Sequence, residues 1–221
     1  MTKDNKNNGT LEVLMLMGTQ CTYCGAMMQA LTELMKDGGF TTLNIVNIEQ
    51  DPQLALKLGV RSVPWLQIGP FELSGSRTKQ ELQTWIERAS SAEGLTEYIE
   101  EMLLEGSINS VKKLIEGESS ALKNVIQLMA DPAAKINIRL GIGAIIEELA
   151  EEEIFKSVTP KLVSYLSDED ARIRGDACHY LSLTKDVSFI SLIENLLTDD
   201  SEEVREIAEE SLEELRLLEV E

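Results

Sequence analysis

The amino-acid sequence predicts two domains, an α/β domain over residues 1–92 and an all-α helical-repeat solenoid over residues 93–221. Three observations support this division. Short apolar strands alternate with helices in the first part, whereas only helical periodicity follows. A helical pattern recurs with a spacing of 31 residues near the C-terminus. The charge is also uneven, because the first part carries a net charge of −1 and the second a net charge of −18.

The first part has the order strand, helix, strand, helix, strand, strand, helix. Helices are indicated by apolar residues three and four apart, and strands by short apolar runs between polar or glycine residues. Because a helix joins the first two strands, we expect them to be parallel, and we expect the last two to form a hairpin. The expected strands are residues 11–17, 41–48, 63–68 and 71–74, and the first expected helix is residues 24–36.

Two later helices have recognisable starts. Asp51 can cap a helix, and Pro52 is tolerated in the first turn because its missing N–H is not needed there. We expect that helix to end at Gly59. Thr78 and Glu81 have the spacing of a capping box, in which each side chain bonds the backbone of the other residue.

The acidic part contains a repeated helical hairpin. Arg174 and Arg205 are 31 residues apart, and several flanking positions shift by the same amount. Stacking such hairpins buries a shared apolar face. We expect Arg174 and Arg205 to pack against the aspartates of the preceding loops rather than to bind an anionic ligand. The equivalent flanking pairs are Asp168 and Asp199, Ala177 and Ala208, and Leu181 and Leu212.

The composition limits the possible partners and the location. An acidic surface repels the phosphate backbone, so we expect no nucleic-acid partner. No apolar run approaches the roughly 20 residues that span a bilayer. The N-terminus lacks the apolar stretch of a secretory signal. We therefore expect no membrane association and a cytoplasmic location.

The chain has three cysteines, and two of them form a Cys-x-x-Cys motif at Cys21 and Cys24. This pair cannot complete a four-ligand zinc site without distant help, and only one other Cys and one His are present. The pair therefore indicates redox chemistry, with no metal and no cofactor. We expect Cys178 to be a small buried residue and His179 to lie at or near the surface.

Residues 11–90 resemble a minimal thioredoxin-like domain. The resemblance rests on the Cys-x-x-Cys at a strand-to-helix turn and on the stretch from Val46 to Pro52. It continues through Ala55 and Lys57 to the stretch Gly59 to Pro64. Val63-Pro64 is similar to the family's cis-proline loop, which implies a cis bond at Pro64. The C-terminal half resembles HEAT-like repeats, which implies a protein-interaction surface.

The sequence departs from thioredoxin at several positions. The buried Asp that thioredoxins carry six residues before the first cysteine is Met15, and the Lys paired with it is Ile45. Both charges are absent together, which avoids a lone buried charge. Cys-Thr-Tyr-Cys is similar to the Cys-Pro-Tyr-Cys of glutaredoxins, but the double glycine that helps to hold glutathione is missing after Phe71. The small units of protein disulfide oxidoreductases resemble this domain more.

The chemistry of the motif assigns a role to each cysteine. A helix start stabilises a thiolate through its free N–H groups and its dipole, so we expect Cys21 to be the nucleophile. Cys24, one turn later, can attack the mixed disulfide that Cys21 forms. We expect the Val63 backbone, beside Pro64, to pair with a substrate strand. Two aromatic residues, Tyr23 and Trp65, are candidates for a substrate rim, but the buried strand that follows Trp65 favours a core position for its ring.

Together these observations predict a thiol–disulfide oxidoreductase that reduces or exchanges protein disulfides. Its partners are then a protein disulfide substrate, an electron donor such as a thioredoxin reductase, and a protein bound to the repeat domain. One alternative is a redox-inert adaptor that binds a protein partner. The other is a glutaredoxin-like enzyme that depends on glutathione.

Overall fold

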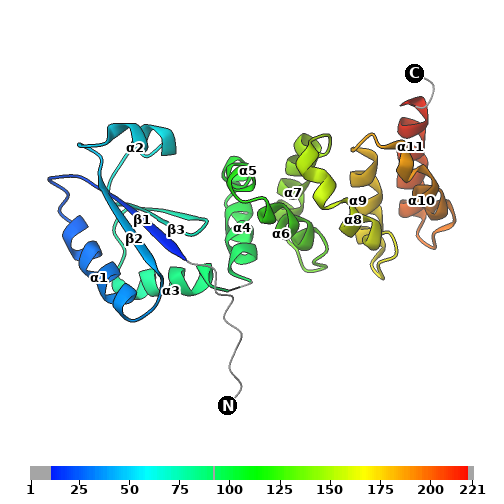
Figure 1. The fold of residues 1–221 in the computed structure, drawn as a ribbon. Helices are drawn as coiled ribbons and strands as arrows, with labels where there is room; N and C mark the ends of the chain where they lie inside the picture. The colour runs from blue at the N-terminus through cyan, green and yellow to red at the C-terminus, as the bar shows by residue number, and fades with distance from the viewer. Residues whose placement is uncertain (1–10, 92, 219–221) are drawn as a thin grey trace, which may run out of the picture. The chain divides into compact units, whose positions relative to one another are not determined.

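The computed structural model describes residues 11–91 and 93–218. These residues divide into two compact units, of which one ends at Tyr98 and the other begins at Ile99. The first unit is α/β and the second is all-helical, which confirms the predicted fold class (Figure 1). The exact boundary at residues 92 and 93 stays a prediction.

A four-stranded mixed sheet with the order β2-β1-β3-β4 forms the centre of the first unit. β1 pairs in parallel with β2 and in antiparallel with β3, and β4 pairs in antiparallel with β3. The expected parallel pair and the expected hairpin are therefore confirmed. The strands are β1 (Glu12–Met17), β2 (Thr42–Asn47), β3 (Trp65–Ile68) and β4 (Phe71–Ser74).

Helices cover both faces of this sheet (Figure 1). Successive strand residues point to opposite faces. Val13 and Met15 of β1 pack with residues of α1 (Cys24–Lys36) and α3 (Lys79–Ala89). On the opposite face, Leu16 and Trp65 pack with Ala55 of α2 (Pro52–Leu58). The core thus lies on both sides of β1, the strand that leads into the cysteine motif.

The local helix signals form as predicted. Asp51 Oδ1 accepts a hydrogen bond from the Leu54 N–H at 3.3 Å, and Gly59 ends α2 with a φ of 70°. That left-handed conformation is one that glycine adopts without steric cost. Glu81 Oε2 accepts from the Thr78 N–H at 2.7 Å, while Thr78 Oγ1 accepts from the Glu81 N–H at 3.2 Å. This reciprocal pair is the predicted capping box.

Three aromatic rings close the end of the first unit. Phe71 of β4 and Trp85 of α3 both contact Tyr98 of α4 (Gly94–Leu104), with ring centroids 4.8 Å and 5.6 Å from that of Tyr98. All three pairs have edge-to-face geometry, which the aromatic quadrupole favours. Tyr98 therefore extends the α/β core beyond α3.

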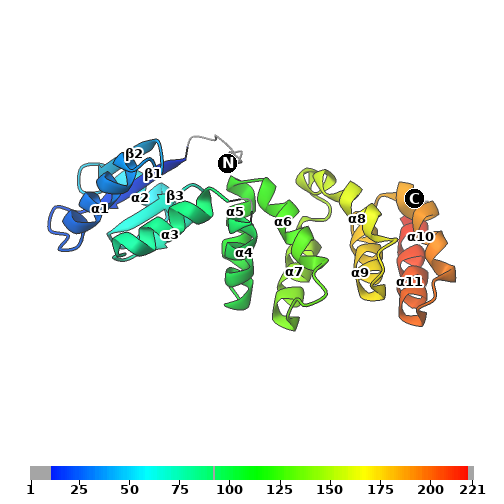
Figure 2. The same cartoon turned by 90° about the horizontal axis from the view of Figure 1, so that it is seen from below.

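The second unit is a stack of helices in which each helix packs against its neighbours in the chain. Figure 2 shows α9 and α11 side by side, with α8 and α10 in a second layer. Its interior is lined by fully buried Ile, Leu, Val and Ala side chains. The helices are α5 (Ile108–Gly117), α6 (Ser120–Met129), α7 (Ile136–Leu149), α8 (Thr159–Tyr165), α9 (Ala171–Ser182), α10 (Ile190–Glu194) and α11 (Glu202–Leu218), with short 3-10 turns at Glu153–Ser157, Val187–Phe189 and Asn195–Thr198.

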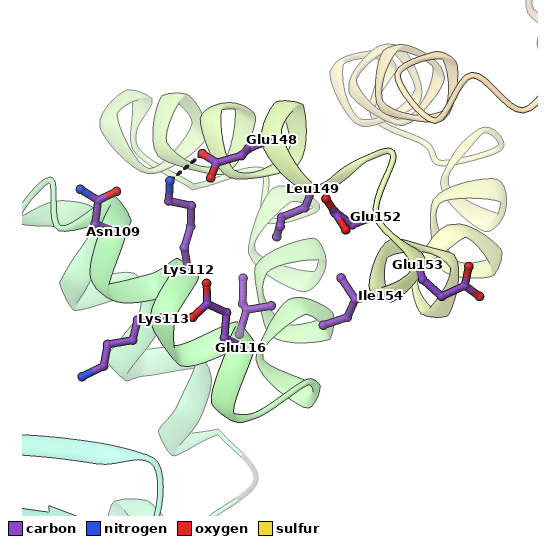
Figure 3. A pocket seen from close by; sticks show the side chains of 10 residues that line it. Asn109, Lys112, Lys113, Glu116, Glu148, Leu149, Glu152, Glu153 and Ile154 are labelled. Carbon is purple, nitrogen blue, oxygen red and sulfur yellow. Dashed lines mark hydrogen bonds and ion pairs between the residues drawn. The ribbon is translucent and has the colours of Figure 1, made fainter. Parts of the chain in front are cut away.

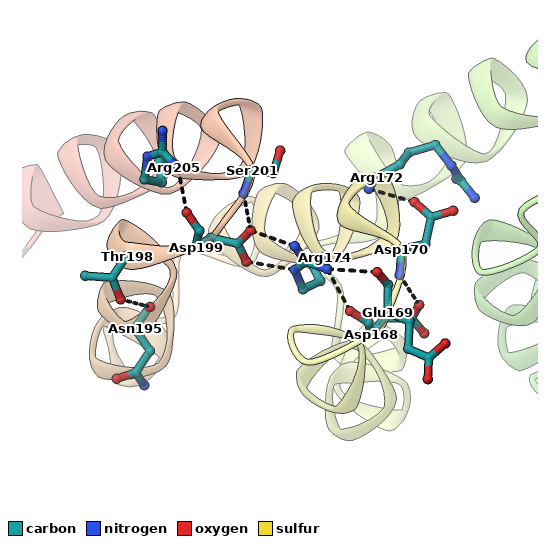
Figure 4. A network of polar contacts seen from close by, with 10 residues as sticks. All are labelled: Asp168, Glu169, Asp170, Arg172, Arg174, Asn195, Thr198, Asp199, Ser201 and Arg205. Atoms are coloured by element: carbon teal, nitrogen blue, oxygen red, sulfur yellow. Dashed lines mark hydrogen bonds and ion pairs between the residues drawn. The ribbon is translucent and has the colours of Figure 1, made fainter.

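The repeated arginines bind the loops that precede their helices, and Arg174 also joins two successive repeats (Figure 4). Arg174 Nη1 donates to the backbone carbonyl of Asp168 at 2.8 Å, and Arg205 Nη1 donates to that of Asp199 at 2.6 Å. Each arginine thus packs against its preceding loop, but through the backbone. The carboxylate partner of Arg174 is Asp199 of the following repeat, at 2.6 and 2.7 Å. The expected packing of each arginine against the aspartate of its preceding loop is therefore confirmed, and the stacking brings the next loop within reach of Arg174 as well.

The remaining cysteine belongs to the core of the repeats, as predicted. Cys178 is 0% exposed, and its thiol donates to Ser211 Oγ of α11 at 3.8 Å. Burial raises the pKa of this thiol to about 11, because an apolar environment disfavours the thiolate. The neighbouring His179 is exposed. Neither residue therefore has the surroundings of a catalytic group.

Candidate redox site

Cys21 and Cys24 form a disulfide where β1 leads into α1, with their Cα atoms 5.4 Å apart. A tight turn follows the strand, because the Cys21 N–H donates to the Gly18 carbonyl at 3.2 Å. Cys24 is the first residue of α1 and is 1% exposed, whereas Cys21 is only half-buried. Of the two sulfur-bearing side chains, that of Cys21 is the one accessible to a substrate.

The start of α1 has no side-chain cap, and the N–H of its first residue, Cys24, donates to the Cys21 carbonyl at 3.3 Å. Tyr23 is the residue before the helix, and its side chain makes no capping hydrogen bond. The N–H groups of the first helical turn have no acceptor within a helix. Such groups and the helix dipole stabilise negative charge, including a cysteine thiolate. Their position supports a thiolate on Cys21, three residues before the first residue of α1.

The loop between β1 and Cys21 is fixed by residues from the end of β2. The Thr19 N–H donates to Glu49 Oε1 at 2.9 Å, and Asn47 Nδ2 donates to Thr19 Oγ1 at 3.0 Å. The Glu49 N–H in turn donates to Asn47 Oδ1 at 3.0 Å. The hydroxyl and N–H of Thr19 lower the pKa of the Glu49 carboxyl, since both stabilise the carboxylate.

The sequence analysis did not predict this network. The partners Thr19 and Glu49 are 30 residues apart and belong to no shared local motif. Only the parallel pairing of β1 with β2 places the two strand ends next to each other. The parallel pair itself was predicted, and combining it with the polar residues that follow each strand is the one signal that points to the contact.

A second loop lies against the first and carries Val63 and Pro64. The peptide bond between these residues is cis, as the resemblance implied. Pro64 is buried, and its carbonyl accepts from the Gly75 N–H at 2.9 Å. Within residues 11–91 the backbone of Val63 makes no hydrogen bond. β3 begins at Trp65, two residues later than predicted, so Val63 keeps its backbone groups available.

The two aromatic residues considered for a substrate rim lie in different environments. Tyr23, between the cysteines, is 62% exposed. Trp65 is 4% exposed and packs against Leu16 and Ala55 under α2. The Trp65 side chain therefore belongs to the core, which was the second of the two alternatives. An exposed aromatic surface at this site consists of Tyr23 without Trp65.

Met15 and Ile45, which replace the charged pair of thioredoxins, differ in exposure. Met15 is 0% exposed and lies in the same core cluster as Cys24. Ile45, its neighbour across the parallel pair, is 40% exposed. The core beside Cys24 thus contains the Met15 thioether in place of a carboxylate that could accept a proton.

No group of three or more His, Cys, Asp or Glu side chains in the described residues is placed to hold a metal ion. The repeat unit does contain a hollow of about 570 Å³ between α5 and the end of α7 (Figure 3). Ile115 lies in its wall at 2% exposure, and Lys112 Nζ pairs with Glu148 at 2.5 Å. The carboxylates along its edge belong to Glu116, Glu148, Glu152 and Glu153.

Comparison with known protein families agrees with this architecture. Residues 11–87 match the model of a thioredoxin domain, and residues 122–213 match that of HEAT repeats. The chain is therefore a thioredoxin domain followed by HEAT repeats, and the Cys21–Cys24 disulfide lies in the thioredoxin domain. A search of curated proteins found no match. None of the helices in the described part of the chain is long and apolar enough to cross a membrane.

Proposed function

We propose that this protein is a thiol–disulfide oxidoreductase that reduces or exchanges disulfides of protein substrates. The observation that supports this most directly is the asymmetry of the cysteine pair. Cys21 is accessible and precedes a helix start, whereas Cys24 is 1% exposed. An accessible thiol can attack a substrate, and a shielded thiol close to it can resolve the product.

The proposed reaction starts from the reduced pair. The Cys21 thiolate attacks one sulfur of the substrate disulfide, and the other substrate sulfur leaves as a thiolate. The Cys24 thiolate then attacks Cys21 Sγ, which releases the second substrate thiolate and forms the Cys21–Cys24 disulfide. The substrate gains two electrons and the enzyme loses two. A dithiol donor, such as a thioredoxin reductase, returns the pair to its reduced state.

The substrate is proposed to lie across Val63 and Tyr23. The Val63 backbone is free to pair with an extended peptide, which provides binding energy without a sequence requirement. The exposed Tyr23 ring supplies apolar area beside the cysteines. Pro64 shapes the loop, and Trp65 contributes by supporting it from the core. A protein substrate with an exposed disulfide fits this surface.

The repeat unit is proposed to dock a protein partner and so to bring the thioredoxin domain to its substrate. Its residues carry nearly all of the net charge of −19. The hollow beside α5 combines an apolar wall with acidic edges, which favours a partner with basic and apolar side chains. The proposed setting is the cytoplasm, where reductants keep thiols reduced.

The two alternative functions are a redox-inert adaptor and a glutathione-dependent enzyme. A redox-inert adaptor would use the repeats alone, but it would have no need for the accessible Cys21. A glutathione-dependent enzyme would have the reactive pair, but the double glycine of glutaredoxins is absent after Phe71. The cysteine environment therefore favours reduction of protein disulfides over both alternatives.

The test is turnover of a protein disulfide with either thioredoxin reductase or glutathione as the electron source. We expect turnover with the reductase and much slower turnover with glutathione. Cys24→Ser should accumulate a mixed disulfide on Cys21, because the resolving thiol is missing. Absence of both turnover and a trapped species would favour the adaptor. Faster turnover with glutathione would favour the glutaredoxin-like enzyme.

A further inference from the structure

Glu49 lies where the two loops of the redox site meet. Its Oε1 accepts the Thr19 N–H from the cysteine loop at 2.9 Å. A Cβ added to Gly18 would lie 3.4 Å from Glu49 Oε1 and 3.3 Å from Val63 Cγ2. Gly18 therefore fits closely between the carboxylate and the loop that carries the cis proline.

From this geometry we propose that Glu49 is a positioning residue that holds the Cys21 loop against the Val63 loop. This inference rests on the proposed redox function, since it assigns a role within the same site. The carboxylate fixes Thr19, two residues before Cys21, and thereby the path of the chain into α1. The spacing between Cys21 and the free Val63 backbone is then the same each time a substrate binds.

The remaining contacts of the loop make Glu49 the central member of the network. The Ile48 N–H donates to the Met17 carbonyl at 2.9 Å, which fixes the strand end before the loop. Asn47 binds the Thr19 hydroxyl and also accepts the Glu49 N–H, at 3.0 Å each. Glu49 is thus itself held in place. Among residues 11–91, the Thr19 N–H donates to this carboxylate, so loss of the carboxylate frees the middle of the loop.

This role predicts a selective effect on substrates. A protein substrate that pairs with Val63 must bring its disulfide to Cys21 in the same complex, so the spacing of the two loops matters. A small disulfide needs only Cys21 and is indifferent to Val63. Loosening the cysteine loop should therefore impair reduction of the protein substrate more than reduction of the small one.

The experiment compares Glu49→Ala with the conservative variant Glu49→Gln and with a matched control, Glu81→Ala. In the same domain, the Thr78 N–H donates to Glu81 at 2.7 Å. Removal of the Glu81 side chain therefore also deletes a hydrogen bond from a threonine N–H to a carboxylate. Each full-length variant is assayed with insulin and with the small disulfide 5,5′-dithiobis(2-nitrobenzoate). Thermal unfolding of each variant monitors folding.

For insulin we expect Glu49→Ala to lower kcat/KM about tenfold, mainly through KM, because the two loops no longer present the substrate together. With the small disulfide the change should be less than about twofold. Glu49→Gln keeps an acceptor oxygen and should restore most of the insulin activity. Glu81→Ala should leave the ratio of the two activities unchanged. Equal losses for both substrates, or an equal change of the ratio in Glu81→Ala, would overturn the positioning role.

A second measurement does not depend on turnover. The equilibrium of the Cys21–Cys24 disulfide with dithiothreitol reports how well the loop holds the two sulfurs together. We expect Glu49→Ala to favour the reduced form by about threefold relative to the wild type, and Glu81→Ala to leave it unchanged. A wild-type protein that reduces neither substrate would refute the proposed function alone. An unchanged equilibrium in Glu49→Ala would refute the positioning role.

Discussion

Cys21 and Cys178 are the same side chain in opposite surroundings, one in each unit of the chain. Cys21 is half-buried beside the start of a helix that has no side-chain cap. Cys178 is 0% exposed between two helices, and burial raises the pKa of its thiol to about 11. The difference shows that the local backbone and solvent access, rather than the residue type, decide which cysteine is reactive.

The two units also differ in how they use polar groups. In the thioredoxin domain, a hydrogen bond from the Thr19 N–H to Glu49 and one from Asn47 to the Thr19 hydroxyl fix an exposed loop at the site. In the repeats, the Arg174 and Asp199 side chains are 15% and 8% exposed and join one repeat to the next. The first arrangement positions a reactive group, and the second maintains a stack. Substitutions in the two units should therefore affect different measurements.

The largest expected effect is on turnover. Cys21→Ser should lower disulfide reduction by about a thousandfold or more, because it removes the attacking sulfur. Cys178→Ala should leave turnover within about twofold of the wild type, since the thiol is enclosed in the other unit. The assay is insulin reduction with a dithiol donor. A large loss in Cys178→Ala would mean that the two units are coupled and would contradict the conclusion that Cys178 has no part in the reaction.

The next expected effect is on thiol labelling. Cys21 should react fastest with iodoacetamide in the reduced protein, Cys24 more slowly, and Cys178 only after unfolding. Because burial raises its pKa from 9.0 to about 11, Cys178 is about a hundredfold less ionised at neutral pH than a cysteine with an ordinary pKa. Brief labelling followed by mass mapping measures the order. Preferential labelling of Cys24 would reverse the assigned roles, and rapid native labelling of Cys178 would contradict its burial.

Much of the fold could be predicted because its signals are local. The cap at Asp51 and the box of Thr78 and Glu81 each act within one turn of chain. Apolar periodicity placed the first helix at its observed bounds, Cys24–Lys36. The repeat spacing likewise identified the stacked helices. In each case the residues that determine the structure are neighbours in sequence.

The candidate site could be predicted only in part, because some of its contacts are remote in sequence. The motif indicated Cys21 and Cys24, and family resemblance implied the cis bond before Pro64. Glu49 was missed, since its bond to Thr19 exists only after two strands pair. The carboxylate contact of Arg174 with the following repeat was not predicted, for a related reason. Stacking of repeats, which no single repeat encodes, brings Asp199 to it.

A smaller effect is expected at the end of the thioredoxin domain. A fragment of residues 1–91 lacks Tyr98, whose ring contacts Phe71 and Trp85. Relative to a fragment of residues 1–106, it should lose about 2–3 kcal/mol of unfolding free energy, although both keep the cysteine site. Urea unfolding followed by tryptophan fluorescence measures the difference. Equal stability of the two fragments would favour the boundary predicted at residues 92 and 93.

The smallest expected effect concerns the junction between repeats, where Asp199→Asn removes the carboxylate that Arg174 binds. The loss should be about 1–2 kcal/mol, between the values for exposed and fully buried ion pairs. Glu153→Gln is the control, because its pair with Lys156 is largely exposed and solvent screening should make its contribution to stability much smaller. Disulfide reduction should be unchanged in both variants. Urea unfolding at neutral pH measures the two losses.

The pH dependence of the stability difference between the wild type and Asp199→Asn distinguishes an ion pair from a packing effect. The hydrogen bond from Arg174 lowers the pKa of the Asp199 carboxyl below its ordinary value of 3.8. Its stabilising contribution is therefore fully present above that ordinary value and disappears as the pH falls through the lower folded-state value. Wild type and Asp199→Asn should converge in stability under strongly acidic conditions. A difference that persists there would mean that Asp199 acts through its shape and backbone contacts, and the repeat junction would then depend on packing instead of charge.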